Sequence, residues 1–268
     1  MRRRNQDKVH GISFRNGSTD PKPKSDKDNH GTKVAGLIAA VKDNGLCIPG
    51  VAYNSTVIGV QLLDSKDEVK HVTDSDMASA FTHYISDVYI YSNSWGPPDG
   101  FGFHGPGILA KKALQEGVTS GRYGKGAIYV FSAGNGGKND NCNADGYANS
   151  IYTIAITSVR GGNSSFPLKS SVYSEVCSPA LAATYGGSSF VHKHLHGKKV
   201  DETRHSDHMY PLQNGIIIVP WDFFGPMGKQ ISHGTTIIRW DQNNPMRFYQ
   251  NPMGFYQNGV GFYKNAMR

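Results

Sequence analysis

Two stretches decide how this chain is expected to fold: His30-Gly31-Thr32-Lys33-Val34-Ala35-Gly36 and, later, Ser132-Ala133-Gly134-Asn135-Gly136-Gly137. An imidazole at the start of a helix, as the first stretch predicts for His30, is suited to general-base chemistry. An asparagine in a glycine-flanked turn, as in the second stretch, presents an amide that can stabilise an oxyanion. Each of these short sequences also occurs often in proteins where it has no catalytic role. Their combination, in this order, indicates one scaffold that holds both groups.

Four continuous apolar runs predict strands that are covered on both faces, as in a parallel sheet. These runs are 57–63, 88–91, 127–131 and 151–156. Helical patterns lie between them, and Gly117 is a stop signal for the last one. The patterns are 31–41, 74–84 and 107–116. This alternation implies right-handed crossovers with helices on both sheet faces, and ligands that bind at the carboxyl ends of the strands.

The residues between and directly after the two stretches carry a more specific resemblance. They include Ser92-Asn93-Ser94-Trp95-Gly96-Pro97, Gly105-Pro106, Gly117-Val118, Gly121-Arg122 and the segment from Asp140 to Tyr152. From roughly Ser13 to Gly187 the chain resembles the subtilisin-like serine proteases of the kexin/furin proprotein convertase type. The resemblance implies an α/β, three-layer subtilisin-like fold with a mostly parallel central sheet. It also implies a serine endopeptidase that processes proteins after basic residues.

The resemblance assigns roles to the side chains of both stretches. His30 takes the proton of the nucleophile and returns it to the leaving amine, and Asn135 donates to the oxygen of the tetrahedral intermediate. A further segment resembles the edge that pairs with the substrate backbone as an added strand. It consists of Ser94, Trp95, Gly96 and Pro97. Trp95 alone is equally compatible with packing in the core.

Four acidic residues complete the expected site. Asp145 resembles the carboxylate at the base of the pocket for the P1 residue, where a buried Lys or Arg needs an opposite charge. Asp99, Asp140 and Glu175 match positions that hold a calcium ion beside that pocket in the family. Calcium prefers several oxygen ligands, which carboxylates from separate loops supply. The alternative is three solvated carboxylates without an ion.

The catalytic aspartate and serine of this family are not recognised in the sequence. Asp7 precedes His30 but lacks a preceding apolar run and a following glycine, and the string Ser232-His233-Gly234-Thr235-Thr236-Ile237-Ile238 has threonine where the nucleophile is expected. We therefore expect a partial peptidase domain over 1–189, incomplete at both ends and inactive as this chain. One alternative is a pseudoprotease that binds peptides or a propeptide without cutting them. The other is an incomplete product without a stable fold.

Residues 190–268 do not resemble the family. A seven-residue repeat over 244–264 contains proline and glycine, which excludes a coiled coil despite its period. We expect this non-family tail to be disordered.

Three cysteines indicate one pair and one remaining thiol. Cys142 and Cys177 match a family disulfide, which suits a protein of the secretory pathway, Golgi or extracellular. The partner expected for Cys47 lies beyond the region of resemblance. Three free cysteines of a cytosolic protein are the alternative.

Charge and hydropathy argue against nucleic-acid binding and against a membrane segment or signal peptide in this chain. The net charge is +7, but nine of the 28 basic residues and five of the 21 acidic residues lie after residue 189, and no nucleic-acid-binding motif is present. No run approaches the ~20 apolar residues of a membrane helix, and the arginines at positions 2–4 are not followed by the apolar core of a signal peptide. We expect protein or peptide substrates with basic residues, no nucleic acid, and no membrane segment or signal peptide in this chain.

Overall fold

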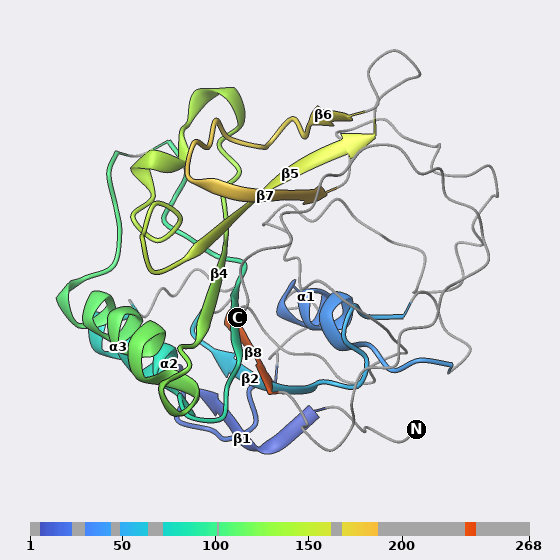
Figure 1. Ribbon diagram of the computed structural model, residues 1–268, viewed down its shortest axis with the longest axis vertical. Coiled ribbons are helices and arrows are strands. Elements are labelled where there is room, and N and C mark those ends of the chain that lie inside the picture. Colours follow the sequence, from blue (N-terminus) through green and yellow to red (C-terminus); the bar gives the residue numbers. More distant parts are fainter. Residues whose placement is uncertain are drawn as a thin grey trace.

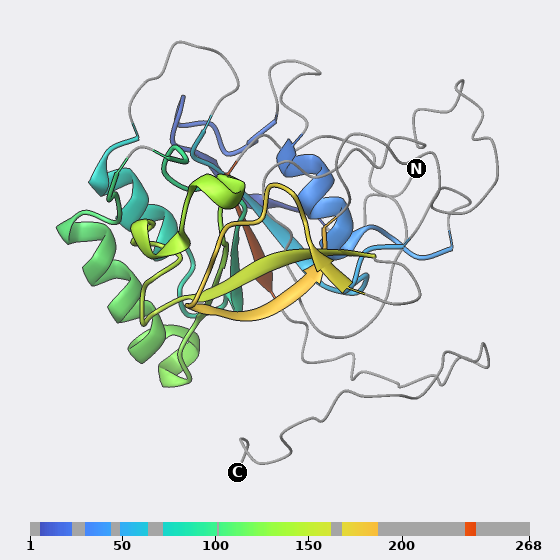
Figure 2. The same ribbon diagram turned by 90° about the horizontal axis from the view of Figure 1, so that it is seen from above.

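The computed structural model describes residues 6–22, 30–43, 49–63, 72–100, 102–161, 168–186 and 234–239. These residues form a single mixed sheet that is flanked by helices on both faces (Figures 1 and 2). The arrangement is the three-layer α/β fold that the sequence predicts.

Eight strands make up the sheet in the described ranges. They are β1 (Gln6–Ser13), β2 (Thr56–Gln61), β3 (Ile90–Asn93), β4 (Ile128–Ser132), β5 (Ile154–Gly161), β6 (Leu168–Ser170), β7 (Ala180–Tyr185) and β8 (Gly234–Arg239). Their order is β1-β2-β8-β3-β4-β5-β6, and β7 also pairs with β5. The pairs β1–β2, β3–β4, β4–β5 and β5–β7 are parallel, whereas β8 is antiparallel to both of its neighbours and β6 to β5. The prediction of a mostly parallel sheet is confirmed.

One face of the sheet is covered by α1 (His30–Ala39), which Figure 1 shows beside the strands. Val34, Ala35 and Ile38 of this helix pack with Val57 of β2 and Val130 of β4 in one apolar cluster. The spacing of these three positions places them on one side of the helix. Because a helix after a parallel strand begins near the carboxyl ends of the strands, α1 directs its first turn toward that edge.

The other face is covered by α2 (Asp74–Phe81) and α3 (Ile108–Gly124), which lie side by side in both views. Thr73 begins α2 with a capping box, since its hydroxyl accepts from the Asp76 N–H and Asp76 accepts in return from the Thr73 N–H. Asp74 accepts from the N–H groups of Leu109 and Ala110 at 2.8 and 3.0 Å and so fixes the first turn of α3 against α2.

Helix α3 continues past Gly117, so the prediction that this glycine ends the helix is wrong. A Cβ atom at Gly117 would overlap the Tyr129 side chain of β4. The glycine therefore permits close packing of the helix on the sheet and does not act as a stop. The helix loses its regular backbone only at Gly121, Arg122 and Tyr123.

Strand β8 comes from the segment 190–268, and its backbone pairs along the whole of β2 and β3. The string that contains Gly234 and Thr235 is thus an extended strand here. The other residues of that segment, including the heptapeptide repeat, lie outside the described ranges, so the expected boundary near residue 189 stays a prediction. No helix among the described residues is long and apolar enough to span a membrane.

Candidate active site

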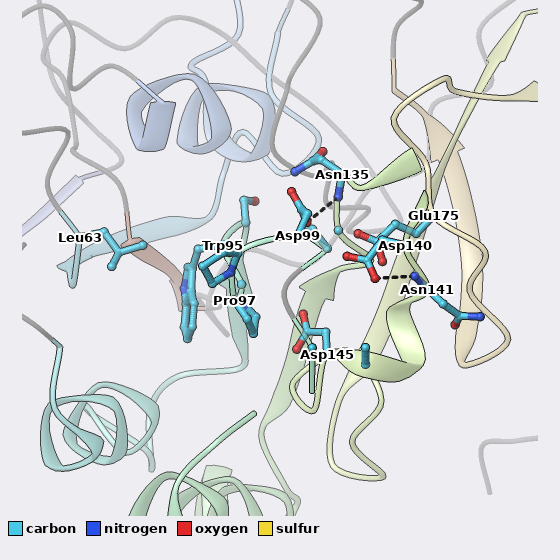
Figure 3. A pocket seen from close by; sticks show the side chains of 16 residues that line it. Leu63, Trp95, Pro97, Asp99, Asn135, Asp140, Asn141, Asp145 and Glu175 are labelled. Atoms are coloured by element: carbon cyan, nitrogen blue, oxygen red, sulfur yellow. Dashed lines mark hydrogen bonds between the residues drawn. The ribbon is translucent and has the colours of Figure 1, made fainter. Parts of the chain in front are cut away.

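A pocket of about 250 Å³ opens where β3 and β4 end (Figure 3). Its walls come from the segment after β3, the turn after β4, the loop 140–145 and Glu175. The residues predicted from sequence that line it are Ser94, Trp95, Gly96, Pro97, Asp99, Asn135, Asp140, Asp145 and Glu175. His30 is not among the lining residues. It begins α1 and is partly buried, and its catalytic role stays a prediction.

The segment Ser94 to Pro97 forms one wall of the pocket. The Trp95 indole is only 8% exposed and meets the rings of Phe131 and Tyr147 edge-on, with centroids 5.4 and 5.1 Å apart. Most of the Trp95 side chain therefore packs in the core, which is the alternative to a role in substrate binding that the sequence left open for this residue.

Asp145 lies at the side of the pocket below Pro97 in Figure 3. Its Oδ1 accepts hydrogen bonds from the N–H groups of Tyr147 at 2.7 Å and Ala148 at 3.3 Å. Its Oδ2 faces Gly96, where an added Cβ would lie 3.0 Å from that oxygen. One carboxylate oxygen is thus held by the protein while the other is directed toward the pocket wall made by Gly96.

Burial raises the pKa of Asp145 to about 6, despite the two N–H donors that lower it. The charges of Asp99 and Asp140 add to the increase. A carboxylate in this position is stabilised by a cation that enters the pocket. No Lys or Arg among the described residues forms an ion pair with it.

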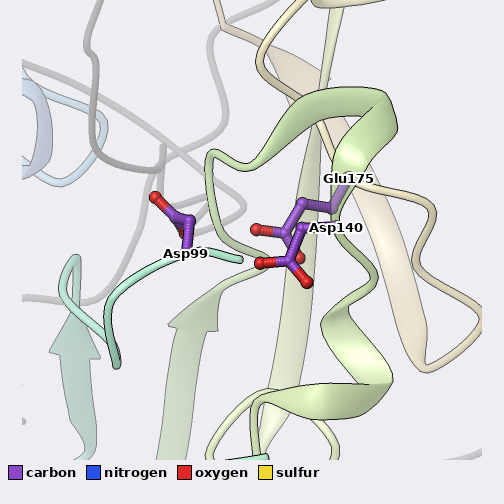
Figure 4. Close-up of side chains that lie close together, drawn as sticks. All are labelled: Asp99, Asp140 and Glu175. Atoms are coloured by element: carbon purple, nitrogen blue, oxygen red, sulfur yellow. The ribbon is translucent and has the colours of Figure 1, made fainter. Parts of the chain in front are cut away.

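Asp99, Asp140 and Glu175 converge beside the pocket (Figure 4). One oxygen from each lies within 4.8 Å of the others. Burial, together with the charges of Asp140 and Asp99, raises the pKa of Glu175 to about 7, although a hydrogen bond from Gly136 opposes the increase. The cluster is a set of hard oxygen ligands that can hold a metal ion.

Backbone N–H groups orient each of these carboxylates. Glu175 Oε1 accepts from Gly136 at 2.9 Å, and Asp99 Oδ1 accepts from Asn135 at 3.1 Å. Asp140 accepts from Asn141 at 2.7 Å and from Gly100. The turn that carries Asn135 is therefore bonded to two of the three acids.

A disulfide joins Cys142 to Cys177, which confirms the predicted pairing. Each cysteine follows a carboxylate of the cluster by two residues, Asp140 in one loop and Glu175 in the other. The Cys142 N–H also donates to the Val176 carbonyl at 3.1 Å. The two loops are thus fixed to each other next to the acidic cluster. Cys47 lies outside the described residues.

Sequence reasoning missed the contribution of Gly134 and Gly136 to the acidic cluster. Gly134 has a φ of +88°, and a Cβ there would overlap the Glu175 carboxylate. Gly136 donates its N–H to the same group. The glycines around Asn135 were the available signal, but nothing in the local sequence connects them with a residue about 40 positions away in the chain.

The chain is similar in sequence to a family of known proteins. The family model described as "Subtilase family" matches residues 3–216. Kexin of Saccharomyces cerevisiae is 44% identical over 183 residues, which cover 67% of this chain and 21% of kexin. Furin-1 of Xenopus laevis is 40% identical over 224 residues, which cover 80% of this chain and 27% of that protein. The chain thus spans about a fifth to a quarter of the length of these relatives.

Among solved structures, the serine protease of Aeromonas sobria in complex with its chaperone superposes with a TM-score of 0.56 at 22% sequence identity. The superposition covers 69% of this chain and 33% of that one. It supports the subtilisin-like fold.

Proposed function

This chain belongs to the subtilase family, and we propose that it forms the peptide-binding part of a kexin- and furin-type serine endopeptidase that processes proteins after basic residues. As the polypeptide 1–268, we propose that it binds such peptides without hydrolysing them. The sequence shows no Gly-Thr-Ser turn to supply a nucleophile and no Asp-Gly strand to orient His30.

The observation that carries this proposal is the environment of Asp145. Its carboxylate is buried, lines the pocket and has one oxygen bonded to the Tyr147 and Ala148 N–H groups. The basic side chain of a P1 residue that enters the pocket supplies the missing positive charge. A charged pair of this kind rejects neutral side chains, because a neutral occupant leaves the carboxylate desolvated and unpaired.

His30 and Asn135 have the roles that the family resemblance gives them. With a nucleophile in place, the His30 imidazole accepts the hydroxyl proton and then donates it to the leaving amine. The Asn135 amide stabilises the oxyanion, a contribution of about 3 kcal/mol in enzymes of this type. Without a nucleophile these groups contribute only weak residual assistance.

We propose that Asp99, Asp140 and Glu175 hold Ca²⁺. Three carboxylates with oxygens within 4.8 Å of one another, one of them with a raised pKa, are a favourable donor set for a hard divalent cation. The bound ion neutralises the cluster. The three acids then keep the loop 140–145, the segment after β3 and the Asn135 turn in one arrangement.

We place the protein in the secretory pathway. The Cys142–Cys177 disulfide supports this, because such bonds persist in oxidising compartments. Proteins and peptides with basic residues before the cleaved bond are the partners that the proposal requires.

Calorimetric titration with two peptides tests the binding proposal. In excess calcium chloride, acetyl-Ala-Ala-Lys-Arg-amide is expected to bind at least about tenfold more tightly than the same peptide ending in norleucine, a difference of ~1.4 kcal/mol. Equal affinities contradict a basic P1 pocket.

A fluorophosphonate probe tests the absence of hydrolysis. The chain 1–268 should remain unlabelled, whereas an active serine protease run in parallel should be labelled. Stoichiometric labelling of a serine contradicts our assignment of this polypeptide as inactive.

A further inference from the structure

The turn that follows β1 contains a modification motif that the proposed function does not use. Asn16-Gly17-Ser18 has the Asn-X-Ser pattern of an N-glycosylation acceptor. Two further tripeptides of the chain fit the pattern, Asn54-Ser55-Thr56 and Asn163-Ser164-Ser165. Because such tripeptides are common by chance, the local structure is needed to distinguish an acceptor from a coincidence.

Asn16 lies in an open turn. Its Oδ1 accepts the backbone N–H of Ser18 at 3.0 Å, which forms an Asx turn. Gly17 has a φ of +71°, and a Cβ there would have nothing within 4 Å. The Gly17 N–H donates to the Ser13 carbonyl at 2.8 Å, and the Ser13 N–H donates to the Ser18 carbonyl at 2.7 Å. The amide oxygen of Asn16 is thus held, while its Nδ2 belongs to an exposed side chain and makes no hydrogen bond with the described residues.

The bond that defines this turn is local. It joins residues that are two positions apart, so it can form in a chain that has not yet folded, which is the form that a glycosyltransferase meets. An N–H donor on Oδ1 draws electron density away from Nδ2 and favours loss of a proton when that nitrogen attacks. In the folded chain Asn16 and Gly17 stay exposed, so the fold has room for an attached sugar.

The second tripeptide is less open. Its middle residue, Ser55, is 4% exposed, and the Ser55 hydroxyl donates to the Ala52 carbonyl at 2.6 Å. Thr56, the hydroxyl residue of the pattern, begins β2 and pairs with Arg239 of β8. The third tripeptide lies outside the described residues. Of the two tripeptides within the described residues, Asn16 is therefore the better acceptor.

Strand β1, which ends three residues before Asn16, has a feature that a glycan would cover. It is the last strand at one end of the described sheet (Figure 1). Its register with β2 shifts between Asp7 and Ile12, and Val9 within this irregular part is 77% exposed. An apolar side chain exposed on a terminal strand promotes association with other chains, and covering the strand opposes it. A glycan is bulky and hydrophilic and so suits this purpose.

We propose that Asn16 is an N-glycosylation site whose glycan shields β1, an inference that rests on the secretory location given above. The co-reactant is an oligosaccharide linked to a polyprenyl diphosphate, and an oligosaccharyltransferase catalyses the transfer. Nδ2 of Asn16 loses a proton to a base of the transferase and forms a bond to the anomeric carbon of the first sugar. The bond between that carbon and the diphosphate oxygen breaks, and the polyprenyl diphosphate leaves.

Expression of the full chain in insect cells, behind a cleavable signal peptide, tests the site. Asn54→Gln and Asn163→Gln leave Asn16 as the acceptor of the natural sequence, and an added C-terminal Asn-Phe-Thr tag reports entry into the endoplasmic reticulum. We expect two glycans by gel mobility, one on the tag and one on Asn16. An occupied tag with an unmodified Asn16 overturns the proposal. Because the added signal peptide supplies entry, this result is independent of where the natural protein resides.

Mass spectrometry locates the glycan. Removal by a peptide N-glycosidase in heavy-oxygen water should convert Asn16 to labelled aspartate. The same incubation without the glycosidase controls for spontaneous deamidation at Asn16-Gly17. Equal labelling with and without the glycosidase shows that Asn16 carried no glycan and contradicts the assignment.

Two substitutions of Ser18 form a matched pair. Both keep the backbone N–H that bonds to Asn16, but only Ser18→Ala removes the hydroxyl that the pattern requires. Ser18→Ala should lose the glycan on Asn16, and Ser18→Thr should keep it. A glycan that persists on Asn16 in Ser18→Ala overturns recognition of this tripeptide.

Light scattering during heating tests the shielding of β1. The untagged glycosylated chain is compared with the same chain after native treatment with the glycosidase, which we expect to aggregate several-fold faster. Val9→Lys should remove most of this difference, because it replaces the exposed apolar side chain of β1 with a charge. Equal aggregation of the two forms, or a difference that is undiminished in Val9→Lys, overturns the shielding role.

Discussion

The backbone N–H of Asn135 donates a hydrogen bond to Oδ1 of Asp99 at 3.1 Å. The residue that we propose as oxyanion donor is thus bonded directly to a residue that we propose as metal ligand. Gly136, the next residue, donates to Glu175 at 2.9 Å. Occupation of the acidic cluster should therefore affect the position of the Asn135 turn.

Asp99→Asn should reduce stabilisation by calcium. With one of three carboxylates removed, the cluster attracts the ion less strongly, and the rise in Tm on adding calcium chloride should shrink to less than half of that of the parent. Differential scanning fluorimetry with and without calcium measures this rise. Asp43→Asn is the matched control, since Asp43 is exposed and lies outside the cluster. Equal rises in the parent and Asp99→Asn would show that calcium binds elsewhere.

Without metal, the free energy of unfolding should fall as the pH rises from about 4 through 7. The pKa values of Asp145 and Glu175 are raised to about 6 and about 7, above the values near 4 of an unfolded chain. The folded state therefore binds more protons than the unfolded state in this interval and loses stability as they dissociate. Urea unfolding in a chelator at several pH values gives the slope.

Glu175→Gln supplies the control for this slope. It removes the ionisation with the higher of the two pKa values, so the decline above pH 6 should become shallower. Calcium should have the same effect on the parent chain, because the ion favours the ionised carboxylates. If the free energy of unfolding depends on pH in Glu175→Gln as it does in the parent, the raised pKa does not belong to Glu175.

Loss of the disulfide should destabilise both the fold and the acidic cluster. The bond closes a loop with a sequence separation of 35, for which the chain-entropy model gives about 2–4 kcal/mol. Cys142→Ser combined with Cys177→Ser should lower the free energy of unfolding by about that amount and weaken calcium binding. If the double variant bound calcium as tightly as the parent, the disulfide would not be needed to hold the acidic cluster together.

Gly117→Ala should destabilise the chain by about 1–3 kcal/mol, because the new methyl group overlaps the Tyr129 side chain. Gly36→Ala is the matched substitution in α1, where nothing lies within 4 Å of the added Cβ. It should instead stabilise the chain by up to about 1 kcal/mol through helix propensity. Thermal and urea unfolding of both variants measure the difference. A Gly117→Ala variant as stable as the parent would exclude the close contact between Gly117 and Tyr129.

Local patterns in the sequence predict much of the fold. Continuous apolar runs locate β2, β3, β4 and β5 to within a few residues, because strands covered on both faces carry few polar residues. The helices α1 and α2 are located in the same way. Strands β1, β6, β7 and β8 were not predicted. β1 is largely polar and β6 has only three residues, and the pairing of β7 and β8 depends on distant segments.

The candidate site, like the fold, could be predicted from the sequence only in part. Nine of the sixteen residues that line the pocket were identified from motifs, whereas their contacts depend on the tertiary structure. No local pattern indicates that Gly134 lies against Glu175, that Asn135 donates to Asp99, or that Gly117 permits the Tyr129 contact. The position of β8 between β2 and β3 is likewise a product of long-range pairing.

The most direct test of the account is a double-mutant cycle between Asp145 and the last residue of the peptide. The affinities of the parent and of Asp145→Asn are measured for the peptides ending in arginine and in norleucine. We predict that Asp145→Asn weakens binding of the arginine peptide at least tenfold and leaves that of the norleucine peptide within about twofold, a coupling of ~1 kcal/mol or more. Equal losses for both peptides, or no loss for either, would contradict the assignment of Asp145 as the residue that recognises a basic side chain.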